Sequence, residues 1–155
     1  MAKQHHYQAT ITWTGNTGSG TAHYSTYERS HTISVNNKPA IAGSSDPAFR
    51  GDAGRHNPED LLLASLSSCH MLWYLHLCAA NNVIVESYTD QAQGTMIEGP
   101  DGSGRFTEVV LLPVIKVSDA SMISKAMALH EEANRYCFIA NSVNFPVLHR
   151  PVVTA

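Results

Sequence analysis

The chain has 155 residues, with 10 basic and 13 acidic side chains and a formal net charge of −3. This length allows one domain with a substantial core and is too short for two independent cores, so we expect a single domain over residues 1–155. The weakly acidic balance excludes the polybasic surface with which proteins bind nucleic acids or anionic membranes.

The N-terminus and the cysteine content indicate a reducing compartment. Residues 1–6 lack the apolar core of a signal peptide, which predicts a cytoplasmic location. Three cysteines do not make a disulfide scaffold, and they are expected to be free, catalytic or metal-bound. The nine histidines show no tight spacing typical of a metal site, so neither a metal nor another cofactor is expected.

The first third of the chain has the pattern of β-structure. Residues 7–13 alternate with period two, and residues 31–35 predict a second strand after a glycine-rich break. Residues 43–57 then form a polar loop that contains Arg50 and Arg55. Loops of this kind often carry functional side chains.

A long helix follows, from residue 58 to about residue 80. Asn57 is a suitable N-cap and Pro58 a suitable first helical residue, and the acidic Glu59 complements the helix dipole. Residues 61–85 contain no Asp, Glu, Lys or Arg. The run is long enough to cross a membrane, but its serines, histidines and asparagines favour a central helix buried by the rest of the protein or by a partner subunit.

The second half predicts two long strands, a helix and a last strand. Residues 83–97 and 106–117 form a hairpin, in which Pro113 indicates an edge strand or a bulge. Ser118 is expected to cap a helix over residues 119–136, whose apolar stripe includes Met122, Ala126, Leu129 and Ala133. With a short strand over residues 144–153, the order of elements predicts an α+β fold.

Helix geometry limits which cysteines can meet. Cys69 and Cys78 are about 13 Å apart along one helix and half a turn out of phase, so they cannot form a disulfide. Cys78 is therefore assigned to core packing. Cys137 lies on the other predicted helix and can approach Cys69, although periodicity does not establish that it does.

Glu59 cannot reach Cys69 within one chain, because the two residues are about 15 Å apart along the same helix. Either Glu59 is only a helix-end charge, or a site is assembled from two chains. A helix that is apolar on all sides also needs more cover than a chain of this size easily provides. Both points favour a homodimer.

Two motifs resemble those of the OsmC/Ohr family, the osmotically inducible and organic hydroperoxide resistance proteins. Residues 57–69, Asn-Pro-Glu-Asp-Leu-Leu-Leu-Ala-Ser-Leu-Ser-Ser-Cys, are similar to a helix start whose Glu precedes the reactive cysteine by ten residues. Residues 130–142 are similar to the family's helix that carries a His and then a second cysteine. This chain departs from the pattern in having His70 directly after Cys69, and Phe138 after Cys137 in place of a proline.

The resemblance implies antiparallel sheets around a long central buried helix, in an intertwined homodimer with active sites at the interface. It implies a thiol peroxidase in which Cys69 is the peroxidatic cysteine and Cys137 the resolving cysteine. Glu59 matches the glutamate that positions a catalytic arginine, for which Arg50 is the best candidate. Arg55 and Arg29 are alternatives.

The expected substrate is an organic hydroperoxide, which the apolar Leu66, Leu72 and Trp73 would favour over hydrogen peroxide. An external dithiol of the lipoyl type is expected to reduce the oxidised cysteines again. His70 and His76 are interpreted as core histidines with satisfied hydrogen bonds, in preference to a direct role in the site. Two other functions are weighed against the peroxidase: a non-catalytic or redox-sensing stress protein of the same fold, and acyl transfer by Cys69 with His130.

Overall fold

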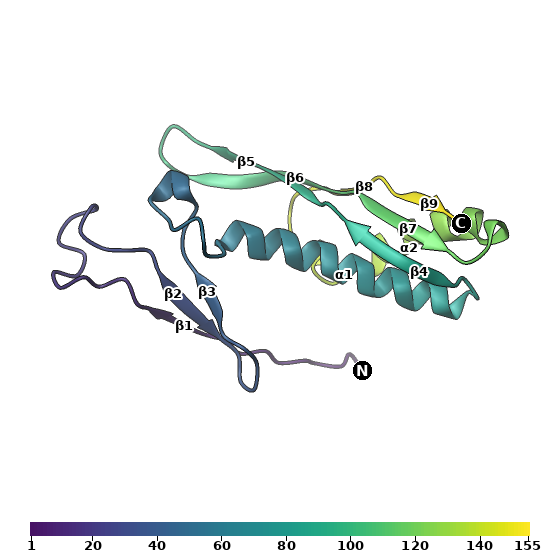
Figure 1. The fold of residues 1–155 in the computed structure, drawn as a ribbon, viewed down its shortest axis with the longest axis horizontal. Coiled ribbons are helices and arrows are strands. Elements are labelled where there is room, and N and C mark those ends of the chain that lie inside the picture. The colour runs from purple at the N-terminus through teal and green to yellow at the C-terminus, as the bar shows by residue number, and fades with distance from the viewer. The chain divides into compact units, whose positions relative to one another are not determined.

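The computed structural model describes residues 1–155 and divides into two compact units, Met1–Leu61 and Leu62–Ala155. Figure 1 shows the order of the elements along the chain. The α+β fold class predicted from the sequence is confirmed.

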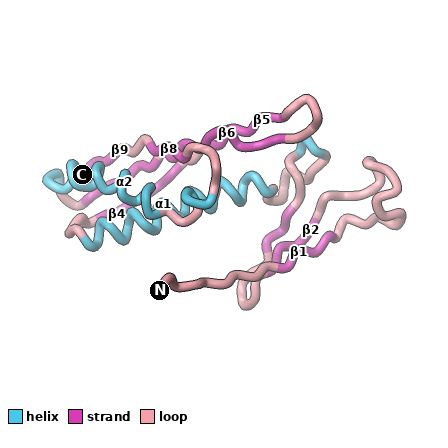
Figure 2. Tube along the Cα trace, turned by 180° about the vertical axis from the view of Figure 1, so that it is seen from behind, coloured by secondary structure: helices cyan, strands magenta, loops and turns pink.

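The N-terminal unit is built on one small antiparallel sheet. Its strands pair in the order β1-β2-β3, and Figure 2 shows that loops make up most of the rest of the unit. Its elements are β1 (Thr10–Trp13), β2 (His31–Ser34), β3 (Ile41–Gly43) and the 3₁₀ turn η1 (Pro47–Phe49). The strand predicted within residues 7–13 is confirmed at Thr10–Trp13, and all four of its residues are exposed.

The long helix α1 covers Pro58–Ala80, as predicted. Its start is fixed by a reciprocal pair of hydrogen bonds. The Asp60 backbone N–H donates to Oδ1 of Asn57 at 2.8 Å, and the Asn57 N–H donates to Oδ2 of Asp60 at 3.2 Å. Each bond satisfies an N–H that the first helical turn would otherwise leave without a partner.

Each of the two long strands predicted from the sequence is divided into two, and the halves belong to different sheets. One sheet has the order β4-β7-β9 and the other β5-β6-β8. The strands are β4 (Val85–Asp90), β5 (Gln93–Glu98), β6 (Gly104–Leu111), β7 (Pro113–Val117), β8 (Val147–His149) and β9 (Val152–Thr154). β4 and β7 pair antiparallel, as do β5 and β6. β8 and β9 join parallel to β6 and β7, so both sheets are mixed.

Pro113 lies at the first position of β7, opposite Asp90. β7 is the middle strand of its sheet, so the prediction of an edge strand is wrong. Proline is tolerated here because the first residue of a strand can do without a ladder N–H.

The second helix begins later than predicted. A 3₁₀ turn, η2 (Ala120–Met122), precedes α2 (Ile123–Tyr136), and the capping side chain is Asp119 instead of Ser118. Oδ1 of Asp119 accepts a hydrogen bond from the Ser121 N–H at 2.8 Å. The predicted stripe is buried at Ala126, Leu129 and Ala133.

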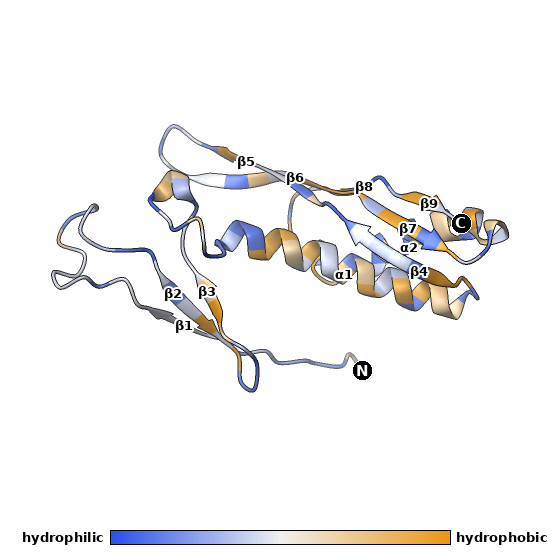
Figure 3. Cartoon of the chain, viewed as in Figure 1, coloured by the Kyte–Doolittle hydropathy of each residue, from blue (hydrophilic) through white to orange (hydrophobic).

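The main core lies where α1, β7 and α2 meet, around Tyr74, Ile115 and Leu129. A second cluster forms around Leu66, Val109 and Leu111. Figure 3 shows apolar residues along the whole length of α1. Only Leu66, His70, Tyr74, Leu77 and Cys78 of this helix are buried. By length and composition α1 is the one helix that could cross a membrane, a test that a core helix also passes.

Candidate thiol site

Cys69 and Cys137 come together, close enough for the Cys69 thiol to raise the pKa of Cys137. Cys69 lies in the middle of α1 and is half-buried, and Cys137 is the C-terminal cap residue of α2. Both thiols are free in this structure. The structure thus places side by side the two cysteines that helix geometry allowed to meet.

The two thiols have different surroundings. Cys137 is only 1% exposed, and the Ala140 N–H lies 3.4 Å from its Sγ atom. Burial, together with the hydrogen bond to Cys69, raises the pKa of the Cys137 thiol to about 11. At neutral pH Cys137 therefore keeps its proton and can donate it towards Cys69, whose partial exposure leaves it accessible to a small molecule.

Cys78 takes no part in this pair. It is 1% exposed and packs in the main core with Tyr74 and Leu77. Burial raises the pKa of its thiol, and a hydrogen bond with Tyr74 acts in the opposite direction. Its role is core packing, as predicted.

Three histidines cluster on the inner side of α1 and α2. Nε2 of His70 lies 3.0 Å from Nδ1 of His130, and the ring of His149 is centred 5.6 Å from that of His70. His70 and His130 are fully buried. Nδ1 of His70, Nε2 of His130 and Nδ1 of His149 have no hydrogen-bond partner. His70 is thus a core histidine, but only one of its two ring nitrogens is satisfied.

His76 was predicted as a core histidine, and this prediction is wrong. Its side chain is exposed, and it meets the ring of Trp73 edge-on with centroids 5.7 Å apart. Leu66 cannot line a substrate site as predicted, because it is fully buried in the second core cluster. Leu72, at 63% exposure, remains available.

Of the three candidate arginines, two are already engaged. Arg29 donates to the carbonyl oxygens of Tyr27 and Tyr24 at 2.6 and 2.7 Å and lies over both rings. Arg55 forms an ion pair with Asp52 at 3.6 Å. The guanidinium of Arg50 makes no hydrogen bond or ion pair and lies 5.8 Å from the Tyr24 ring.

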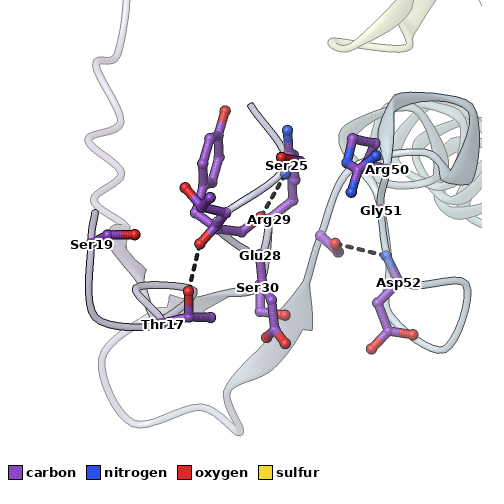
Figure 4. A pocket seen from close by; sticks show the side chains of 12 residues that line it. Thr17, Ser19, Ser25, Glu28, Arg29, Ser30, Arg50, Gly51 and Asp52 are labelled. Carbon is purple, nitrogen blue, oxygen red and sulfur yellow. Dashed lines mark hydrogen bonds between the residues drawn. The ribbon is translucent and has the colours of Figure 1, made fainter. Parts of the chain in front are cut away.

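Arg29 and Arg50 both line an open pocket of about 710 Å³ in the N-terminal unit (Figure 4). Arg50 closes η1 in the left-handed region, with φ 62°. A side chain there is sterically disfavoured. Glu59 lies half-buried in the first turn of α1 and forms no ion pair. The roles of Arg50 and Glu59 at Cys69 stay predictions.

Sequence reasoning named Trp73 but missed the aromatic group that it forms beside the thiols. The ring of Trp73 stacks on Tyr136 with centroids 5.2 Å apart and meets Phe138 edge-on at 5.5 Å. Tyr136 and Phe138 flank Cys137, and Trp73 follows Cys69 by one helical turn. The aromatic residues on both sides of Cys137 were the available signal. No group of three His, Cys, Asp or Glu side chains is arranged to hold a metal ion.

The sequence profile described as OsmC-like protein matches residues 51–149. The chain belongs to the OsmC-like family. An OsmC-like protein of unknown function from Vibrio cholerae O1 biovar eltor superposes with a TM-score of 0.86 at 31% identity, covering 96% of this chain and all of that one.

More distant structures share the OsmC-like fold. An organic hydroperoxide resistance protein from Elizabethkingia anophelis has a TM-score of 0.71 at 18% identity, with 99% of each chain covered. One from Legionella pneumophila has a TM-score of 0.71 at 15% identity, covering 99% of this chain and 100% of its own. A search of curated proteins gave no match.

Proposed function

We propose that this OsmC-like protein is a thiol peroxidase that reduces organic hydroperoxides. The observation that carries the proposal is the proximity of the partly exposed Cys69 to the buried Cys137, whose raised pKa keeps its thiol protonated at neutral pH. The Elizabethkingia and Legionella proteins that share the fold are organic hydroperoxide resistance proteins, which supports the same chemistry.

In the proposed reaction the thiolate of Cys69 attacks the terminal oxygen of the hydroperoxide, and the O–O bond breaks. The alkoxide takes up a proton and leaves as an alcohol, while Cys69 becomes a sulfenic acid. The sulfur of Cys137 then attacks the sulfenic sulfur. A disulfide forms and the thiol proton leaves with the hydroxyl group as water. An external dithiol, of the lipoyl type, reduces the disulfide and is itself oxidised.

A homodimer belongs to the proposal. α1 is a 23-residue apolar helix of which only five residues are buried and eight are exposed, so part of its surface lacks cover within one chain. In a dimer, Arg50 and Glu59 of one subunit are proposed to serve Cys69 of the other. Arg50 is the preferred arginine because its guanidinium has no competing partner, whereas Arg29 and Arg55 are held by their own neighbours. The proposed setting is the cytoplasm, with no bound cofactor.

The test compares the wild type with Cys69→Ser, Cys137→Ser and Cys78→Ser after treatment with one equivalent of cumene hydroperoxide. We expect the wild type to lose two thiols and to form a Cys69–Cys137 disulfide, which peptide mapping would locate. Cys137→Ser should give a sulfenic acid at Cys69 that dimedone traps. Cys78→Ser is the matched control and should behave as the wild type. Peroxide consumption by Cys69→Ser would refute the proposal.

A second measurement separates catalysis from redox sensing by the same thiols. With dihydrolipoamide present in excess, a peroxidase consumes many equivalents of peroxide per chain, whereas a sensor is oxidised once and stays oxidised. Acyl transfer by Cys69 and His130 is disfavoured, because His130 is fully buried and its Nδ1 atom is engaged by His70.

A further inference from the structure

An aromatic group beside the thiol pair is partly open to solvent, although its Trp73 packs against the main core. We name it the aromatic cluster and define it as Trp73, Tyr136 and Phe138. Phe138 is 68% exposed and Tyr136 39% exposed, although both are large side chains with apolar ring faces. A contiguous apolar surface left open in this way marks a site of interaction more often than an isolated exposed side chain does.

The cluster borders the thiols through both helices. Trp73 lies one turn, about 6 Å, beyond Cys69 on α1. Phe138 follows Cys137 directly, and the two thiols are close together. A molecule that reaches Cys69 therefore enters beside these rings.

The rings are held in a fixed arrangement. Trp73 stacks on Tyr136 at an interplanar angle of 25° and meets Phe138 at 89°. Arg135 holds Tyr136 in turn. Its guanidinium lies 4.6 Å from the ring centroid and donates to the Tyr136 hydroxyl at 3.0 Å. Trp73 thus contacts both other rings, and the exposed Phe138 offers a ring against which a further aromatic group can pack.

We propose that Trp73 and Phe138 bind the aryl group of an arylalkyl hydroperoxide and make the protein selective for such substrates. Three rings are a small surface beside the roughly 800 Å² that each partner contributes to a stable protein interface, so the proposed occupant is a small aromatic group. The selectivity rests on the proposed peroxidase function. The binding of the aryl group does not.

The kinetic test uses two peroxides that differ by one group. Cumene hydroperoxide carries a phenyl where tert-butyl hydroperoxide carries a methyl, so the ratio of their second-order rates of Cys69 oxidation isolates the aryl contribution. We expect Phe138→Leu to lower this ratio about threefold to tenfold, the size of an aromatic pair contact. The control Phe106→Leu makes the same change at a ring that packs on Phe145, in the other cluster, and should leave the ratio unchanged.

The binding test needs no peroxide chemistry. In a Trp13→Phe background Trp73 is the only tryptophan, and its fluorescence reports on the cluster. Cumyl alcohol, the product of cumene hydroperoxide, should change this fluorescence with saturation, and tert-butanol at the same concentrations should not. Phe138→Leu should weaken the binding of cumyl alcohol at least about threefold.

These two tests fail in distinguishable ways. Saturable binding of cumyl alcohol without any peroxide consumption would keep the aryl site and refute the peroxidase. Peroxide consumption with an unchanged rate ratio in Phe138→Leu would keep the peroxidase and refute the aryl site. If Phe138→Leu changes the molecular mass in sedimentation and leaves cumyl alcohol binding unchanged, the cluster is a subunit contact, which also overturns the proposal.

Discussion

His70 and His130 hold each other inside the C-terminal unit through one hydrogen bond, with Nε2 of His70 3.0 Å from Nδ1 of His130. A neutral imidazole has one N–H and one lone pair. Whichever ring donates, one N–H and one lone pair therefore remain without a partner, at Nδ1 of His70 and Nε2 of His130. Tyr74 stacks on His130 with centroids 3.9 Å apart. A positive charge on either buried ring is therefore unfavourable.

This pair predicts sensitivity to acid. Burial lowers the pKa of His70 to about 4, and the charge of His149 acts in the same direction. Burial, with the charges of His70 and His149, lowers the pKa of His130 to about 3. The unfolded chain takes up these protons at about pH 6.5. Below that pH the unfolded state holds more protons, so the free energy of unfolding falls as the pH falls towards 4, by about 1 kcal/mol per pH unit for each histidine.

Urea unfolding at several values between about pH 7 and about pH 4.5 measures this dependence. His130→Leu should show a flatter decline than the wild type, because one of the two protonation sites is gone. His76→Leu is the control, since His76 is exposed. Parallel declines in the wild type and His130→Leu would show that the buried pair is not responsible.

The thiol of Cys137 is predicted to react slowly with alkylating agents. Its raised pKa, about 11, and its 1% exposure both keep the thiolate scarce and inaccessible at neutral pH. Iodoacetamide at about pH 7.5 should label Cys69 first, and the rate at Cys137 should keep rising up to about pH 11. Mass spectrometry of peptides would measure the two rates. Faster labelling of Cys137 than of Cys69 would contradict the assigned roles.

The sequence predicted the long helix well because its signals are local. Asn57 and Asp60 are three residues apart, and together they fix the start of α1. The uncharged run after them then decides its length. The division of the long strands could not be predicted in this way, because Asp90, at the end of β4, is hydrogen-bonded to residues 22 and 23 positions away.

In the candidate site, too, some contacts could be predicted from the sequence and others could not. The pairing of Cys69 with Cys137 could be expected, since helix geometry left no other partner and the family resemblance named both residues. The contact between His70 and His130 joins residues 60 positions apart and has no periodic signature. The aromatic contacts of Trp73 have no periodic signature either, because they depend on where α2 ends.

Arg50→Asn tests the arginine proposed to act on Cys69. Asn tolerates the left-handed backbone that Arg50 adopts at φ 62°, so the change removes the charge with little effect on the loop. We expect the rate of Cys69 oxidation by cumene hydroperoxide to fall roughly 100-fold, the order of loss when one preorganised donor is removed from a reacting centre.

Arg55→Asn is the matched control, because Arg55 is already paired with Asp52. It should retain most of the rate. If Arg55→Asn loses as much activity as Arg50→Asn, or if only Arg55→Asn does so, the assignment of Arg50 is wrong. Thermal unfolding of both variants would show whether either change acts through stability.

Asp90, the last residue of β4, joins α1 to Leu112, the residue between β6 and β7. Its Oδ1 accepts from the Leu112 N–H at 2.7 Å, and its Oδ2 accepts from the Ser67 hydroxyl at 2.6 Å. Asp90→Ala leaves both donors without this partner, and we expect it to lower the free energy of unfolding by about 2–4 kcal/mol, since a hydrogen bond to a charged group contributes roughly 1.5–3 kcal/mol. Ser67→Ala removes one bond and should cost about half as much.

Glu86→Ala supplies the comparison on the neighbouring surface. Glu86 pairs with Lys116 at 2.9 Å, but both side chains are about half exposed, at 45% and 55%. Such a pair contributes less than about 1 kcal/mol. Urea unfolding of the three variants should therefore rank them Asp90→Ala, Ser67→Ala and Glu86→Ala in decreasing cost. Equal losses in the free energy of unfolding for Asp90→Ala and Glu86→Ala would mean that strand pairing alone, without the Asp90 carboxylate, holds the chain here.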